Sequence, residues 1–178
     1  MKKVLLFLIV MFFITGCSSL RVNVDYDPNF DVKAQKTFAI VHYTNEGEDT
    51  LFNDRFTDAL AQDLIAKGYA KENKNSADLI FVFHVNVESK TDIHTDYTMV
   101  GYGGYGYGGQ MMATTRTYKY TKGTLVLDAL NPKDEKIVYR MIATDTLKTY
   151  DNPEERTKYV KILVNETMKD FPSKVVSQ

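Results

Sequence analysis

Residues 101–110, GYGGYGYGGQ, combine six glycines with three tyrosines and contain the spacing G-x-G-x-x-G. In dinucleotide-binding proteins that spacing joins a strand to a helix, and the N-terminus of the helix faces the pyrophosphate. Here the next residues, MMATTRTYKY, alternate as in a strand, and no Lys-Ser or Lys-Thr pair follows the glycines. The stretch therefore predicts no nucleotide site and no cofactor.

The same stretch is interpreted as a loop, because glycine imposes no backbone preference and supports no packed element by itself. We place this Gly/Tyr-rich loop at residues 97–113. Two interpretations remain open: a flexible connection with solvated tyrosines, or a contact surface. In the second, Tyr102, Tyr105 and Tyr107 bind a glycan, peptidoglycan or a protein, because tyrosine offers a large amphipathic area at little entropic cost.

The sequence DIHTD places Asp92, His94 and Asp96 at a spacing of two, which on a strand points all three side chains to one face. Such a set could act as an acid/base group or as metal ligands. Successive members lie about 7 Å apart along a strand, too far to hold one ion without further groups. We therefore predict surface residues and no metal site, and keep a hydrolase or a metal-binding protein as the alternative function.

The N-terminus has the features of a bacterial export signal. Two lysines precede an unbroken apolar run of 11 residues, Val4 to Ile14, which is shorter than the roughly 20 residues that span a bilayer as a helix. The run ends in Ile14-Thr15-Gly16-Cys17, which resembles the lipobox of bacterial lipoproteins, in which the cysteine is lipidated and the chain is cleaved just before it. We thus expect a signal peptide at residues 1–16 and lipid attachment at Cys17.

Cys17 is the only cysteine, so the chain cannot form an internal disulfide, and lipidation explains the unpaired thiol. The two or three acyl chains that the resemblance implies would anchor the protein stably, whereas one chain binds only marginally. Ser18 in the next position resembles the default sorting to the outer membrane. We expect a lipid-anchored protein of the cell envelope that faces the periplasm.

The mature chain would be slightly acidic. Cleavage removes Lys2 and Lys3 and leaves 20 basic and 23 acidic residues, which gives no basic field for nucleic acid. Its length suits one domain with a real core. We expect residues 17–36 to form the lipidated cysteine and a tether, and residues 37–178 to form a single domain.

The periodicity of the hydrophobic residues predicts the elements of that domain. TFAIVHY (37–43) and ADLIFVFHVNVES (77–89) read as strands, and the helical repeat from Thr50 predicts an amphipathic helix of about 17 residues between them. Two strands joined by a helix should be parallel. A last helix is predicted with Asn152 as its N-cap and Pro153 in its first position.

Between these helices, TRTYKYTKGTLVLDAL and EKIVYRMIATDTL predict further strands, with a kink or bulge at Lys122-Gly123. The predicted order is β-α-β-β-β-β-α. We therefore expect an α+β fold with a mixed, mostly antiparallel sheet and two helices packed on one face.

Four segments resemble bacterial lipoproteins of the domain of unknown function 4136 family: VDYDPNFDVKAQKTFAIV, LIAKGYAKENKNSADLIFVFHV, KGTLVLDALNPKDEKIVYRMIATDTL and NPEERTKYVKILVNETMKDFPSK. The resemblance implies no catalytic residue, because the family brings none with it. Our first functional hypothesis is a non-enzymatic binding or scaffold module, and a subunit of a larger envelope assembly is a further alternative.

Overall fold

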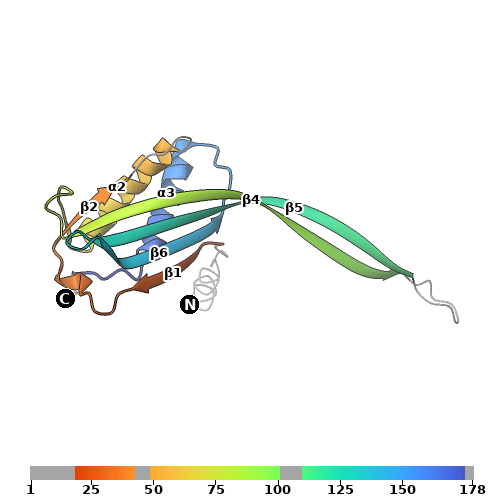
Figure 1. Ribbon diagram of the computed structural model, residues 1–178. Helices are drawn as coiled ribbons and strands as arrows, with labels where there is room; N and C mark the ends of the chain where they lie inside the picture. The colour runs from red at the N-terminus through yellow and green to blue at the C-terminus, as the bar shows by residue number, and fades with distance from the viewer. Residues whose placement is uncertain (1–18, 43–48, 101–109, 175–178) are drawn as a thin grey trace, which may run out of the picture.

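The computed structural model describes residues 19–42, 49–100 and 110–174 of the protein. One six-stranded sheet, in the order β1-β6-β5-β4-β2-β3, carries two helices on one face, and a long hairpin of β4 and β5 projects from its end (Figure 1). The elements are β1 (Arg21–Tyr26), the 3-10 turn η2 (Val32–Ala34), β2 (Thr37–Val41), α2 (Thr50–Ala66), β3 (Ala70–Lys71), β4 (Leu79–Val100), β5 (Gln110–Asn131), β6 (Lys136–Thr146) and α3 (Pro153–Thr167).

The predicted β-α-β unit is confirmed. α2 has the predicted 17 residues, and its N-cap residue Asp49 accepts a hydrogen bond from the Phe52 amide at 3.0 Å. The helix ends before Gly68, whose φ of 92° is favourable for glycine alone. β2 and β4 are parallel, with Phe38 opposite Leu79, so the crossover helix lies against the sheet as expected.

α3 also follows the prediction. The Asn152 side chain accepts a hydrogen bond from the Glu155 amide at 2.8 Å, and Pro153 occupies the first helical position. The inward face of this segment is buried, as expected from its sequence: Val160, Leu163, Val164, Thr167, Met168 and Phe171. The α+β class, with both helices on one face of a mixed and mostly antiparallel sheet, is confirmed (Figure 1).

The segment expected to be a tether contains a strand. β1 pairs antiparallel with β6 along its whole length, and Val22 and Val24 pack against the core. Two valines in alternation were too weak a signal for a strand next to a targeting segment. The folded domain therefore includes residues from Arg21 onward, and the unpaired part of the tether is much shorter than expected.

The core lies between the helices and the central strands. Phe81 and Phe83 of β4, Leu127 of β5 and Met141 of β6 are fully buried beneath the two helices, and Phe83, Leu127 and Met141 are in register with one another. On the opposite, helix-free face, Arg140 donates two hydrogen bonds to the Asp128 carboxylate, at 2.6 and 2.7 Å. That carboxylate, in turn, raises the pKa of the Arg140 guanidinium by hydrogen bonding.

Gly123 does not interrupt β5, contrary to the expected kink. The register runs unbroken through Val87 and Gly123, and the only irregularity of the β5–β6 pairing lies between Ala129 and Leu130. A Cβ at Gly123 would lie 2.8 Å from Cδ2 of Leu147. Glycine is therefore suited to this position because the Leu147 side chain packs closely over the strand.

Candidate functional site

The predicted Gly/Tyr-rich loop at 97–113 is shorter than expected, because both of its ends are strand. β4 continues to Val100, which pairs with Gln110, the first residue of β5. Tyr102, Tyr105 and Tyr107 lie outside the described residues, and so does Cys17. A strand, not a helix, follows the glycines, so the element that a dinucleotide fingerprint needs for its phosphate is missing.

β4 and β5 leave the body of the protein together as a two-stranded arm, which we define as residues 89–100 and 110–121. Figure 1 shows this arm extending well beyond the helices. Twelve residues of extended strand span about 40 Å. An isolated two-stranded hairpin is at best marginally stable in water, and neither helix covers this one (Figure 1).

Asp92, His94 and Asp96 lie on this arm and share one face of β4, as predicted. His94 Nε2 is 3.3 Å from an Asp92 carboxylate oxygen, but the two side chains are 62% and 56% exposed. Across the strand pair they face Tyr118 and Arg116. Among the described residues, no group of three or more His, Cys, Asp and Glu side chains is arranged to hold a metal ion. The structure thus joins two of the three predicted residues, on an open surface.

Both long edges of the arm lack a neighbouring strand in the described part of the chain. The pairing of β2 with β4 stops at Val82, and the pairing of β6 with β5 stops at Lys122. One further hydrogen bond, from the Leu147 amide to the Thr121 carbonyl at 2.8 Å, closes the β6 side. Beyond these points each edge presents free backbone donors and acceptors.

The two edges carry opposite charge. The outer part of β4 holds Glu88, Asp92 and Asp96 against the single Lys90, whereas the outer part of β5 holds Arg116, Lys119 and Lys122 and no acid. Glu88 and Lys90 pair with each other at 2.5 Å. Within the described residues, Asp96, Arg116 and Lys119 form no ion pair. The arm is therefore acidic along one edge and basic along the other.

The faces of the arm also differ. One face of the arm continues the core side of β4 and begins with Val87, Ser89, Thr91 and Ile93. Its one charged residue is Lys119 of β5, which lies opposite Thr91. Ile93 is 64% exposed, and Tyr118 on the opposite face is 50% exposed. The arm therefore exposes large side chains on both of its faces.

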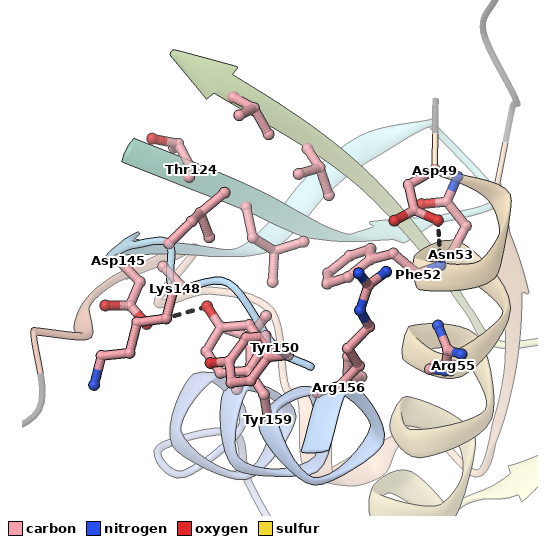
Figure 2. Close-up of a pocket in the computed structure, with 18 of the residues that line it drawn as sticks. Asp49, Phe52, Asn53, Arg55, Thr124, Asp145, Lys148, Tyr150, Arg156 and Tyr159 are labelled. Carbon is pink, nitrogen blue, oxygen red and sulfur yellow. Dashed lines mark hydrogen bonds between the residues drawn. The ribbon is translucent and has the colours of Figure 1, made fainter. Parts of the chain in front are cut away.

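A second site lies where the arm joins the body. A cavity of about 620 Å³ opens between the sheet and the N-terminal ends of α2 and α3. Figure 2 shows Asp145, Tyr159 and Tyr150 on one side, and Phe52, Arg55 and Arg156 on the other. Sequence patterns do not indicate this cavity, because its lining residues come from α2, β4, β5, β6, α3 and the adjoining loops.

Asp145, at the end of β6, organises one side of this cavity. The Tyr159 hydroxyl donates a hydrogen bond to its carboxylate at 3.1 Å, and the Ser19 hydroxyl donates another. Burial, with the neighbouring Asp145 carboxylate as a second cause, raises the pKa of Tyr159 above its ordinary value. The phenol thus stays protonated, and the Tyr150 ring lies beside it, tilted by 34°, at 5.2 Å between ring centroids.

The fold and these sites define a single α+β domain with two helices on one sheet face and a projecting β-hairpin. The chain belongs to the DUF4136 family, a domain of unknown function, whose sequence model matches residues 22–173. None of the proteins with curated descriptions matches it. No helix in the described ranges is both long and apolar enough to cross a membrane.

Three solved structures are similar in fold. A PelC variant from Paraburkholderia phytofirmans, described as a dodecamer, has a TM-score of 0.51 at 12% identity, over 88% of this chain and 99% of that one. A DUF4136 family protein from Bacteroides thetaiotaomicron has a TM-score of 0.45 at 19% identity, over 85% and 95%. A PDZ domain protein from Parabacteroides distasonis has 0.50 at 10% identity, over 90% of this chain and 37% of that one.

Proposed function

We propose that this protein is held by a lipid on Cys17 in the bacterial cell envelope, at the outer membrane and facing the periplasm. There it acts without catalysis, as an assembly module whose contact element is the arm. The N-terminal sequence supports the anchor, and the arm with its two open, oppositely charged edges carries the functional proposal.

The anchor and the arm leave the same end of the sheet. Arg21 at the start of β1 pairs with Thr144, and Thr144 pairs with Thr124. Thr124 is only two residues after Lys122, where the pairing of β5 with β6 begins. Arg21 is the fourth residue after Cys17, so the chain between them reaches at most about 14 Å. A lipid on Cys17 would therefore hold the base of the arm close to the membrane.

The partner that fits the arm is a second copy of the same chain. An acidic β4 edge repels another β4 edge, and a basic β5 edge repels another β5 edge, whereas β4 of one copy attracts β5 of the next. Such a contact uses two different surfaces, so it repeats from copy to copy and forms a closed ring or an open chain. The dodecameric state of the similarly folded PelC variant supports a repeating assembly of this kind.

The Gly/Tyr segment between the two strands of the arm has a second role in this proposal. Tyr102, Tyr105 and Tyr107 lie between Val100 and Gln110, the last paired residues of the arm. We expect them to contact a glycan, peptidoglycan or another envelope protein beyond the reach of the body. Changing all three to serine should reduce binding to isolated peptidoglycan without dissociating the assembly.

The anchor is tested by Cys17→Ser. The hydroxyl is a far poorer nucleophile than a thiolate, so the variant should remain as unlipidated precursor. Intact mass and partitioning into detergent measure the result. A lipidated Cys17→Ser protein would contradict the proposed anchor.

The arm is tested by excision. Replacing residues 90–120 with a two-residue Asn-Gly turn keeps the Ser89–Thr121 pair and removes both open edges. We expect wild-type protein to form assemblies by light scattering and the excised protein to be monomeric. The double variant Lys158→Glu/Lys161→Glu, which reverses exposed charges on α3 only, is the matched control and should assemble as wild type does. An excised protein that still assembles would contradict the role of the arm.

A further inference from the structure

The cavity at the base of the arm has an apolar interior. Val85 and Val87 of β4, Leu125 of β5 and Leu163 of α3 line it, with Leu147 closing one wall. Leu147 can lie over β5 because Gly123 has no side chain in its way. Its volume of about 620 Å³ is in the range of pockets that take small organic ligands.

The acidic groups of the cavity already have partners. Asp145 accepts hydrogen bonds from the Tyr159 and Ser19 hydroxyls. Asp49 caps α2 by accepting from the Phe52 amide. Neither carboxylate therefore needs a cation from a ligand.

The two arginines that line the cavity form no ion pair within the described part of the chain. Arg55 on α2 is partly buried and Arg156 on α3 is exposed. Figure 2 shows the Arg156 side chain extending from α3 towards Phe52, with Arg55 on the next turn of α2. Arg156 lies in the first turn of α3, where the helix dipole also favours an anion, and Arg55 lies in the second turn of α2.

We propose that this cavity binds a single-chain anionic amphiphile, of which a long-chain fatty acid is the simplest. The hydrocarbon chain lies against Val85, Val87 and Leu125, and the carboxylate pairs with Arg55 and Arg156. The apolar interior and the two unpaired guanidinium groups at one end match the two parts of such a ligand. Ser19 ties the N-terminal segment to Asp145 at the rim, so the anchor of the proposed function would place the cavity near membrane lipid.

The test uses residues 19–178, which contain every core residue described above and need no detergent. Titration with a fluorescent polyunsaturated fatty acid should show saturable binding of one molecule per chain, and palmitate should displace it. Hexadecanol, which has the same chain without the charge, should displace it at least tenfold less well. This protein lacks the anchor, so the outcome is independent of the lipidation of Cys17.

Three variants locate the site. Arg55→Gln/Arg156→Gln should weaken palmitate at least tenfold and leave hexadecanol unchanged. Val87→Arg should abolish binding of both, and it should fold because Val87 is 56% exposed. Arg21→Gln, an exposed arginine on β1, is the control and should bind as wild type does.

Equal displacement by palmitate and hexadecanol, or unchanged palmitate binding in the double arginine variant, would overturn the proposal. So would unchanged binding in Val87→Arg. Vesicles of phosphatidylglycerol distinguish the source of the ligand. Free fatty acid as the ligand predicts that the protein does not sediment with these vesicles in the absence of the probe, and sedimentation that excess palmitate does not reduce would contradict a single-chain ligand.

Discussion

Val41 of β2 lies opposite Val82 of β4, and this is the last residue pair that the two strands share. From Phe83 to Val100 the outer edge of β4 has no partner among the described residues, although β4 stays paired with β5 along its full length. Exposed edges of this length are usually shortened, covered or charged in natural proteins. Here they are charged with opposite signs, which prevents like edges from pairing and permits unlike ones.

The arm should contribute little to the stability of the body. Replacing residues 90–120 by a two-residue turn removes no residue of the core cluster. We expect the free energy of unfolding to change by less than about 0.5 kcal/mol, as for surface changes away from the core. Urea denaturation followed by circular dichroism measures it. A loss of several kcal/mol would mean that the arm packs on the body.

Substitutions on the two faces of β4 test which face packs on the core. Phe83 is fully buried, packed at 4.7 Å from Phe56 and stacked on His42 at 4.4 Å between ring centroids. Phe83→Ala should therefore cost about 3 to 5 kcal/mol. Asn86 lies on the opposite face and is exposed, so Asn86→Ala should cost about 0.5 kcal/mol or less. Equal losses in thermal melts would contradict the assignment of the faces.

Acid stability should depend on Asp78. Its carboxylate accepts hydrogen bonds from the Lys36 and Thr37 amides at 2.8 and 3.0 Å, and the bond from Lys36 is the largest cause of its lowered pKa. A carboxylate with a lowered pKa stabilises the fold above its unfolded pKa, and this contribution disappears as pH falls through the folded value.

Asp78→Asn should thus cost about 1 kcal/mol at neutral pH, because it keeps an acceptor but loses the charge. The difference from wild type should shrink as the pH falls below the ordinary aspartate value of 3.8 and should be constant above about pH 5. Denaturation curves across this range measure it. If the difference in unfolding free energy between wild type and Asp78→Asn grew as the pH fell, the Asp78 carboxylate would not stabilise the fold in its charged form.

The periodic elements were predictable because their signals are local. The helical repeat from Phe52 to Leu64 and the cap at Asn152 each act within a few residues, and both helices form as predicted. β1 was not predicted, because its two valines gain their burial from pairing with β6, more than a hundred residues away.

The sequence indicated only part of the arm. The spacing of Asp92, His94 and Asp96 would place them on one face of a strand, and β4 does continue through them, but the strand predicted from residue 77 ended at residue 89. Alternation of apolar and polar residues indicates strands that pack on a core. The arm packs on no core, so this pattern did not show its full length. The cavity could not be predicted either, since Arg55, Asp145 and Arg156 meet only through the packing of the sheet and the two helices.

The pairing of β4 from one copy with β5 from the next is tested most directly by mixing two charge variants. Asp92→Lys/Asp96→Lys makes both edges basic, and Arg116→Glu/Lys119→Glu makes both edges acidic. Each variant alone should be monomeric by light scattering, because all its edges repel. An equimolar mixture should form assemblies in which the two variants alternate. Two variants that assemble separately as wild type does, or a mixture that stays monomeric while wild type assembles, would contradict this pairing.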